Sequence, residues 1–176
     1  MKIETAIILC AGYGKRLHPI TLQVPKPLIK IKNKSLLLNT IELVANLGIK
    51  KIKLNTYYLA EQIEDFVNKL ENYGKIEIVK DGEEILDTGG GIKNIMKMST
   101  DENFLVLNPD TIWNLGYKKI ILEMIEYYKL KNLNNLLMVA HKSKSYDTRF
   151  DGDFSMNNHM LSKNEKCNYI YTCLLY

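Results

Sequence analysis

The sequence lacks the long apolar runs that membrane proteins carry. Among its 176 residues, no stretch of about 18 consecutive apolar residues occurs. The apolar stretch within the opening MKIETAIILCAG is too short for a secretory signal peptide and has the wrong flank. We therefore expect no membrane partner, and we predict a cytoplasmic protein.

Cysteine and histidine are also scarce, with three of each in the whole chain. Neither type has a spacing typical of a metal site, and the odd number of cysteines suggests reduced thiols. The chain also offers no convincing pair of nucleophile and base, so covalent catalysis is not expected. The residues concerned are Cys10, Cys167, Cys173, His18, His141 and His159.

An excess of charge of one sign is missing too. The formal net charge is +4 and the sequence pI is about 8.8. Because the basic residues are scattered along the chain, this mild excess does not predict a nucleic-acid partner. It is compatible with a small anionic ligand.

The sequence does contain a regular alternation of short β-rich runs and helical periods. Apolar or alternating runs predict strands, and apolar residues at i, i+3, i+4 and i+7 predict amphipathic helices. This order is typical of βαβ units. We therefore predict an α/β fold with three layers: a Rossmann-like, mainly parallel (mixed) sheet with helices on both faces. The predicted strands cover residues 5–10, 51–55, 75–80, 103–108 and 135–141.

The first predicted helix follows residue 35 and has recognisable signals at both ends. Ser35 is a suitable N-terminal cap, and Gly48 stands where a left-handed C-terminal cap belongs. The pattern weakens from Lys142 onward. No linker or internal repeat divides the chain, so we predict one domain over residues 1–176.

The loop after the first predicted strand is unusually stiff and basic. It contains three of the four prolines of the chain, together with Gly12, Gly14 and Arg16. Lys26 lies between two prolines, which restrict the backbone on both sides of it. Glycines allow backbone N–H groups to approach an anion, and an arginine can bind phosphate oxygens through two parallel hydrogen bonds. The loop predicts a phosphate site, with a plain surface loop as the alternative.

Two common phosphate motifs are excluded by particular residues. A P-loop needs glycine where Leu9 stands, and Ser or Thr where Arg16 follows Lys15. A dinucleotide fingerprint needs a third glycine where Leu17 stands. A nicotinamide dehydrogenase is therefore disfavoured.

The run CAGYGKRLHPITLQVPKPL resembles the signature of the sugar-phosphate nucleotidyltransferases, with Cys10 in place of the more usual alanine. The resemblance implies that the loop containing Ala11, Gly12 and Gly14 surrounds the phosphates of a nucleotide. It also implies catalytic roles for Arg16, which would stabilise departing pyrophosphate, and for Lys26, which would contact phosphate.

The segment GEEILDTGGGI from residue 82 to residue 92 resembles the base-reading segment of the same family. The resemblance implies nucleotide contacts at Glu84 and Gly89, with three small residues leaving room for a flat base. The same residues also read as a helix start with Thr88 as its cap. The form DTGGGI is most similar to the uridylyltransferases that act on N-acetylmuramate 1-phosphate, and is also similar to the mannose-1-phosphate guanylyltransferases.

A third motif, FLVLNPDTIW, places Asp110 after a buried strand. A carboxylate that faces triphosphate needs a cation between them, and Mg²⁺ suits both kinds of oxygen. The resemblance implies that Asp110 is a Mg²⁺ ligand, although Pro109 replaces the usual glycine. The alternative is an aspartate that only forms a turn. Trp113 is expected to pack at the rim of the site.

The end of the chain departs from the family pattern. NYIYTCLLY resembles a strand that carries Y-T-G in relatives, with Cys173 at the glycine position. Relatives continue further, so we expect a domain that lacks their terminal region, its second metal carboxylate and part of its sugar pocket. We expect this strand to form an unsupported edge. The acidic FDGDF, residues 150–154, fits either a family segment or a solvated turn.

Together these residues predict a transfer of a nucleoside monophosphate from a nucleoside triphosphate, with UTP or GTP favoured, to a sugar 1-phosphate. The acceptor phosphate is mostly dianionic near neutral pH, since its second pKa is about 6, and so needs no general base. The alternative is a shortened nucleotide-binding homologue with weak or no turnover. The residues leave the base, the sugar and the oligomeric state open.

Overall fold

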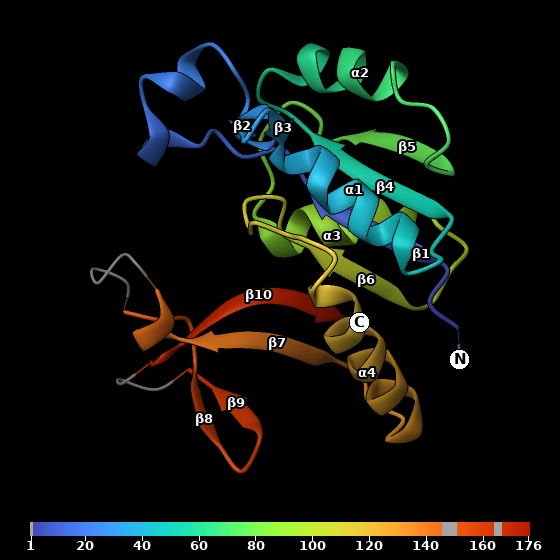
Figure 1. The fold of residues 1–176 in the computed structure, drawn as a ribbon, viewed down its shortest axis with the longest axis vertical. Helices are drawn as coiled ribbons and strands as arrows, with labels where there is room; N and C mark the ends of the chain where they lie inside the picture. Colours follow the sequence, from blue (N-terminus) through green and yellow to red (C-terminus); the bar gives the residue numbers. More distant parts are fainter. Residues whose placement is uncertain (1, 146–150, 164–166) are drawn as a thin grey trace.

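The computed structural model describes residues 2–145, 151–163 and 167–176. Its main feature is a six-stranded sheet in the order β5-β4-β1-β6-β10-β7 (Figure 1). The strands are β1 (Thr5–Leu9), β4 (Lys51–Thr56), β5 (Lys75–Lys80), β6 (Phe104–Leu107), β7 (Leu136–His141) and β10 (Tyr169–Leu175).

The sheet is mainly parallel. β1 pairs in parallel with β4 and β6, and β4 pairs in parallel with β5. β10 is antiparallel to both of its neighbours, β6 and β7. The predicted mixed sheet is therefore confirmed, with β10 as the one antiparallel strand.

Helices cover both faces of this sheet, as predicted. The helices are α1 (Leu36–Asn46), α2 (Ala60–Asn68), α3 (Thr88–Lys97) and α4 (Tyr117–Leu130). On one face, Ile8 and Leu54 pack in a large core with buried side chains of α1, α2 and α4. On the other face, Ile7 and Val106 pack with Ile95 of α3 in a smaller core. Strands covered on both sides become continuous apolar runs, which is why they were recognisable.

Strand order creates a crevice at the carboxyl ends of β1 and β6. From β1 the chain moves to β4 and β5 on one side, whereas β6 lies on the other side of β1. In open α/β sheets this reversal is where ligands bind, because the loops after the two strands diverge there. The loop after β1 contains the glycines, and the loop after β6 contains Asp110.

The expectation that the last strand forms an unsupported edge is wrong. β10 lies inside the sheet, hydrogen-bonded to β6 on one side and to β7 on the other. Cys173 and Leu175 have no exposed surface. The chain returns from β7 and inserts β10 antiparallel between β6 and β7, so both of its edges are paired and its last residues are partly or fully buried.

The weakly patterned region contains a small hairpin of β8 (Ser155–Asn157) and β9 (Met160–Ser162). A second short pair, β2 (Lys30–Ile31) and β3 (Lys34–Ser35), precedes α1. Four 3-10 turns complete the structure: η1 (Lys15–Leu17), η2 (Ile20–Leu22), η3 (Lys26–Leu28) and η4 (Lys142–Lys144). Such short elements carry too few residues to show a period in the sequence.

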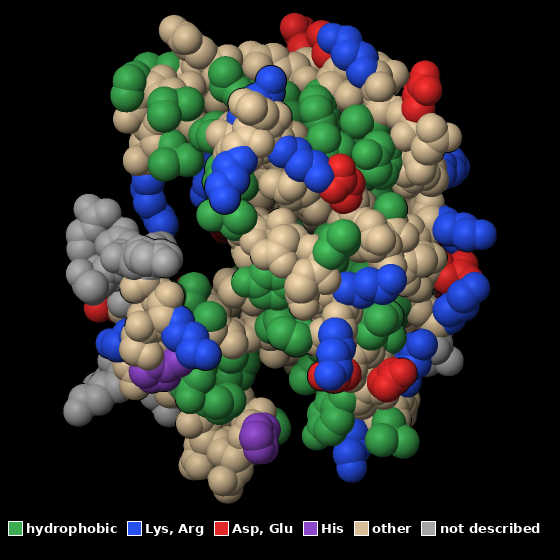
Figure 2. Space-filling model, in the orientation of Figure 1, with side chains coloured by type: hydrophobic (Ala, Val, Ile, Leu, Met, Phe, Trp, Pro, Cys, Tyr) green, Lys and Arg blue, Asp and Glu red, His purple; other side chains and the backbone are tan. Residues whose placement is uncertain are grey.

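The surface view supports the prediction that the basic residues are scattered. On the face shown in Figure 2, Lys and Arg side chains are intermixed with Asp and Glu rather than gathered in one stripe. In the described part of the chain, no helix has the length and apolarity needed to cross a bilayer.

The predicted cap of the first helix is present and offers a stability test. Ser35 Oγ accepts a hydrogen bond of 3.1 Å from the backbone N–H of Leu38. Ser35→Ala should lower the free energy of unfolding by about 0.5–2 kcal/mol, because one N–H at the helix start loses its partner. Urea denaturation measures this change. Ser35→Thr should keep most of the stability, and a loss as large as that of the alanine variant would contradict the capping role.

Candidate active site

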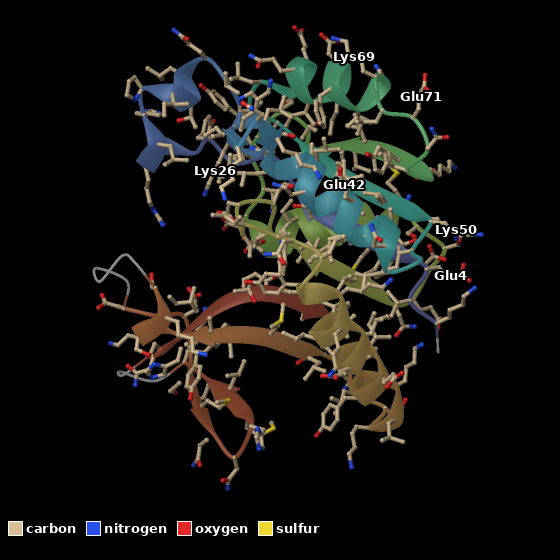
Figure 3. The ribbon with its side chains drawn as sticks, viewed as in Figure 1. Glu4, Lys26, Glu42, Lys50, Lys69 and Glu71 are labelled. Atoms are coloured by element: carbon tan, nitrogen blue, oxygen red, sulfur yellow. The ribbon has the colours of Figure 1, made fainter. Side chains whose placement is uncertain are left out.

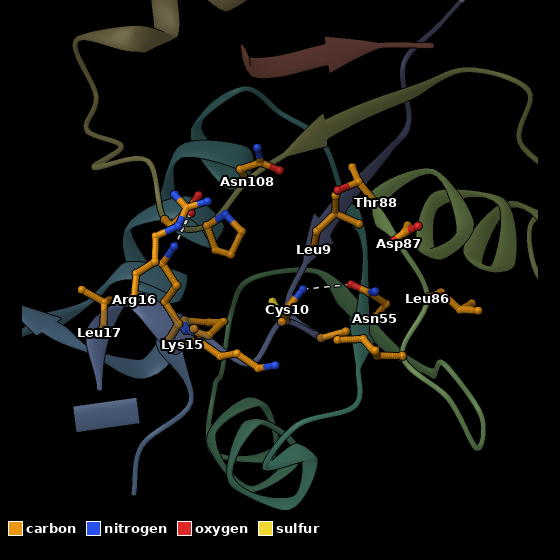
Figure 4. A pocket seen from close by; sticks show the side chains of 18 residues that line it. Leu9, Cys10, Lys15, Arg16, Leu17, Asn55, Leu86, Asp87, Thr88 and Asn108 are labelled. Atoms are coloured by element: carbon orange, nitrogen blue, oxygen red, sulfur yellow. Dashed lines mark hydrogen bonds and ion pairs between the residues drawn. The ribbon is translucent and has the colours of Figure 1, made fainter. Parts of the chain in front are cut away.

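A cavity of about 430 Å³ opens at the crevice between β1 and β6 (Figure 4). Its walls come from segments that are distant in sequence, at residues 9–12, 14–17, 26–27, 55, 85–88 and 108–110. Figure 4 shows Arg16 and Asn108 on one side and Leu86, Asp87 and Thr88 on the other. The predicted residues Ala11, Gly12, Gly14, Arg16, Lys26 and Asp110 all line this cavity.

The two glycines of the first loop serve different purposes. Gly12 is exposed, and a Cβ placed on it would have no neighbour within 4 Å. Gly14 has a left-handed backbone with φ +64°, and a Cβ there would lie 2.9 Å from Thr21 Cγ2. Gly14 is thus required by the turn, whereas Gly12 leaves open backbone at the cavity. Thr21 Oγ1 holds the turn by donating a hydrogen bond of 2.9 Å to the Gly14 carbonyl.

Arg16 lies on η1, directly after this turn. The backbone N–H of Leu17 donates to the Gly14 carbonyl at 2.9 Å, which begins the 3-10 turn. Arg16 is exposed and lines the cavity. Its neighbour Lys15 lies over the ring of Tyr13, with Nζ 5.2 Å from the centroid. The loop therefore presents two cations beside open backbone.

Lys26 and Asp110 meet across 84 residues of sequence. Lys26 Nζ donates to Asp110 Oδ2 at 2.5 Å, and both side chains are about one-third to two-fifths exposed. Lys26 begins η3, and Pro25 before it has φ −62° while Pro27 after it is buried. The rigid backbone holds the ammonium at the cavity, near the loop that leads to β2 (Figure 3). The structure thus places the predicted phosphate-binding lysine on the predicted metal ligand.

The segment after β5 forms the opposite wall, but only in part through the predicted residues. Residues 85–88 line the cavity, whereas Glu84 and Gly89 are exposed just outside that lining. A Cβ on Gly89 would meet nothing within 4 Å. The roles proposed for Glu84 and Gly89 stay predictions.

The three consecutive glycines are explained by packing as well as by space. A Cβ on Gly90 would lie 3.1 Å from Leu86 Cβ, and a Cβ on Gly91 would lie 2.7 Å from Asn55 Nδ2. Only Gly89 therefore leaves open room. The predicted cap at Thr88 is wrong: Thr88 is the first helical residue and Asp87 is the cap position, without a side-chain cap hydrogen bond.

Sequence reasoning missed Asn55 and Asn108, which also line the cavity. Both lie at the carboxyl ends of predicted strands, and an amide at that position was the available signal. Asn108 accepts, through its carbonyl, a hydrogen bond of 2.8 Å from Trp113 Nε1. Trp113 is 1% exposed and packs edge-on against Tyr117, so its predicted packing role is confirmed.

Three tyrosines next to the cavity connect its walls to one another. Tyr13 packs on Tyr57 and Tyr58, with ring centroids 6.0 and 5.1 Å apart. Tyr57 donates from its hydroxyl to the carbonyl of Glu83 at 3.1 Å. A hydrogen bond with Tyr13 is the main reason that the pKa of Tyr57 is raised. These contacts connect the glycine loop, the end of β4 and the segment after β5.

The remaining candidate groups have structural environments. Cys10 is 1% exposed, and burial raises the pKa of its thiol, so it is not an activated nucleophile. Asp153 accepts a hydrogen bond of 2.8 Å from the backbone N–H of Tyr171. This supports the turn interpretation of FDGDF, whose first residue, Phe150, lies outside the described residues.

The comparisons with known proteins point in one direction. The sequence profile of the family described as "Nucleotidyl transferase" matches residues 5–148. The chain is 37% identical over 120 residues to the mannose-1-phosphate guanylyltransferase catalytic subunit beta of Drosophila pseudoobscura pseudoobscura, which covers 66% of this chain and 32% of that protein. It is 37% identical over 126 residues to mannose-1-phosphate guanyltransferase 2 of Candida glabrata, covering 70% and 34%. It spans about a third of the length of these relatives.

Solved structures agree with the sequence comparison. HddC from Yersinia pseudotuberculosis, in complex with GMP-PN, superposes with a TM-score of 0.71 at 25% identity over 98% of this chain and 76% of that one. A UDP-glucose pyrophosphorylase in complex with UDP-glucose has a TM-score of 0.75 at 18% identity over 99% and 76%, which shows a shared fold. A family profile that matches most of the chain, on the fold of these neighbours, shows that this protein belongs to the nucleotidyl transferase family.

Proposed function

We propose that this protein transfers a nucleoside monophosphate from a nucleoside triphosphate to a sugar 1-phosphate. The observation that carries the proposal is the meeting of the glycine loop, Arg16, Lys26 and Asp110 on one cavity at the topological switch point. Family membership supports it, because the matched relatives bear the names of such enzymes. The predicted cytoplasmic location stays a prediction.

The reaction requires positioning and charge stabilisation. A phosphate oxygen of the sugar 1-phosphate attacks the α-phosphorus of the triphosphate, a new P–O bond forms, and the bond to the β-phosphate bridging oxygen breaks. Pyrophosphate leaves with its electron pair and needs no proton from the protein at that moment. Because negative charges crowd together in this step, Arg16, Lys26 and the open amides around Gly12 would lower the barrier electrostatically.

Asp110 is the residue that would hold Mg²⁺. Its exposed carboxylate already attracts a cation, since Lys26 Nζ lies 2.5 Å from Oδ2. Among the described residues, no group of three or more acidic, histidine or cysteine side chains could hold a metal by itself. The single carboxylate of Asp110 fits Mg²⁺, which commonly binds through one or two carboxylates and takes its other ligands from substrate phosphates and water. Bound there, Mg²⁺ would neutralise phosphate charge.

GTP is the triphosphate that we favour, with mannose 1-phosphate or a related hexose 1-phosphate as acceptor. Relatives at 33–37% identity are named as mannose-1-phosphate guanylyltransferases. HddC, at 25% identity, was solved with GMP-PN. UTP is the runner-up, supported by the likeness of the DTGGGI segment to uridylyltransferases.

A second function, nucleotide binding with weak or no turnover, is favoured by one observation. In the described part of the cavity lining, Asp110 is the one carboxylate next to the two catalytic cations, and Asp87 lies on the opposite wall (Figure 4). A single carboxylate gives less support to the metal than two would. Binding would then persist because the phosphate-contacting residues are present.

Pyrophosphate release distinguishes the two functions. We expect release from GTP with Mg²⁺ and one member of a panel of sugar 1-phosphates, and little release without an acceptor. A thermal shift with GTP but no pyrophosphate from any pair would support the silent binder. Neither a thermal shift nor release with any of the four common triphosphates would contradict both functions.

A further inference from the structure

Asn55, at the end of β4, is a buried amide with all its partners identifiable. It is 3% exposed, and its Oδ1 accepts a hydrogen bond of 2.9 Å from the backbone N–H of Cys10. Its Nδ2 donates to both carboxylate oxygens of Asp81, at 3.2 and 3.1 Å. The Cys10 N–H can only donate and the Asp81 carboxylate can only accept. These two partners therefore determine which side of the amide carries Oδ1 and which carries Nδ2. Asn55 therefore connects the start of the glycine loop to Asp81.

Asp81 is the buried carboxylate that holds the Asn55 amide in place. It follows β5 directly, is 8% exposed, and its backbone N–H donates to the Thr56 carbonyl at 3.0 Å. Burial raises the pKa of its carboxyl, while hydrogen bonds from Asn55, from the Leu86 backbone N–H and from Asn94 oppose that shift. The buried carboxylate of Asp81 thus fixes the side chain of Asn55 at the end of β4.

Helix α3 is held against the same pair by close packing. A Cβ on Gly91 would lie 2.7 Å from Asn55 Nδ2, so the helix reaches this distance only with glycine. The Gly91 backbone N–H donates to the Asp87 carbonyl at 2.8 Å, which links the helix start to the wall. The packing of Gly91 on Asn55 therefore links the wall, through the start of α3, to the end of β4.

The chemistry of this wall differs from that of the opposite side. It is lined by the apolar Ile85 and Leu86 together with Asp87 and Thr88, whereas Arg16, Lys26 and Asp110 line the rest of the cavity. A flat heteroaromatic base suits a wall that combines apolar side chains with hydrogen-bonding groups, and phosphates suit the cationic side. Small displacements of the wall would therefore affect the base more than the phosphates.

We propose that Asn55 and Asp81 are positioning residues that hold the wall of residues 85–88 in register with the glycine loop and so determine how well the site distinguishes one nucleobase from another. The inference rests on the proposed function, since it assumes a nucleotide in the cavity. Neither residue needs to touch the nucleotide for this role. Asn55 reaches the loop through the Cys10 N–H, and Asp81 holds the Asn55 amide against Gly91 of α3. The Gly91 N–H in turn donates to the Asp87 carbonyl of the wall.

The test compares a complete nucleotide with its phosphates alone. Calorimetry with Mg²⁺ would measure the affinities of GTP, UTP and inorganic tripolyphosphate for the parent and for Asp81→Asn. An asparagine offers one acceptor oxygen where the carboxylate offers two, so donors around it lose partners. We expect the preferred nucleotide to bind roughly tenfold more weakly, the GTP-to-UTP ratio to move toward one, and tripolyphosphate to bind as in the parent.

Two further variants separate positioning from simple loss of stability. Asp101→Asn removes a carboxylate that accepts from Thr5 and Lys51 at the other end of the sheet, and it should lower the melting temperature while leaving the ratio unchanged. Gly91→Ala should reproduce the loss of base preference by displacing Asn55, and alanine favours the helix, so folding is not at risk from propensity.

The outcomes that overturn the inference are specific. A parent-like GTP-to-UTP ratio in either Asp81→Asn or Gly91→Ala would do so. Equal losses of nucleotide and tripolyphosphate affinity would also do so, because the damage would then be general. A parent protein that binds no triphosphate would overturn the proposed function together with this inference, and is recognised before any variant is made.

Discussion

Arg16→Ala is expected to reduce turnover by roughly a hundred- to a thousandfold while the protein remains folded. Losing one stabiliser of charge in the transition state commonly costs about 2.7–4 kcal/mol. Arg16 is exposed on η1 and lines the cavity, so the substitution creates no void in the core. Steady-state pyrophosphate release with GTP and the active sugar 1-phosphate measures the effect, and thermal denaturation confirms folding.

The matched control for this substitution is Lys50→Ala. Lys50 is also an exposed cation, and it lies at the other end of the sheet, away from Lys26 (Figure 3). It changes the net charge by the same amount, so a general charge effect on anionic substrates would appear in both variants. If the Arg16 variant melted normally and turned over at the parent rate, the proposed phosphate contact would be wrong.

Asp110→Asn is expected to remove most of the Mg²⁺ dependence of triphosphate binding and to lower turnover by roughly a thousandfold. A bound divalent ion commonly supplies several kcal/mol of charge stabilisation in phosphoryl chemistry. The amide is nearly isosteric with the carboxylate but carries no charge to hold the ion or to pair with Lys26. Calorimetry of GTP binding over a range of Mg²⁺ concentrations measures the dependence.

Asp65→Asn provides the control for the second prediction, because Asp65 is an exposed carboxylate on α2 and does not line the cavity. It should bind GTP with the Mg²⁺ dependence of the parent. An Asp110 variant that kept the same Mg²⁺ dependence would place the ion on other residues. A variant that bound GTP more weakly at every Mg²⁺ concentration, including none, would indicate that Asp110 acts through Lys26 instead.

Local patterns were sufficient for the first five strands of the large sheet and for the helix boundaries near Ser35 and Gly48. Each of these features depends on neighbours within about one turn or a few residues, such as the Ser35 cap and the left-handed Gly48 at φ +80°. The same holds for the motif after β1, whose turn at Gly14 is stabilised by Thr21 only seven residues away. Features that depend on residues close together in the sequence can therefore be predicted from it.

The first residue of α3 and the position of β10 in the sheet could not be predicted in this way. Thr88 is predicted to cap α3, yet the helix includes it, because the Gly91 N–H donates to the Asp87 carbonyl and begins the helix one residue earlier. β10 was predicted at an edge, yet it pairs with β6 and β7. An apolar run shows that a strand is buried but does not show which strands will accept its hydrogen bonds.

The sequence alone determined the α/β class, the glycine loop after the first strand and the acidic residue after β6, since each depends on consecutive residues. Only the tertiary structure brought Lys26 onto Asp110, Asn55 onto Asp81 and Gly91 onto Asn55. These pairs are separated by 84, 26 and 36 positions in the chain. Their contacts depend on strand order and on the packing distance of a helix, which no local pattern specifies, because both are set by how distant segments pack together.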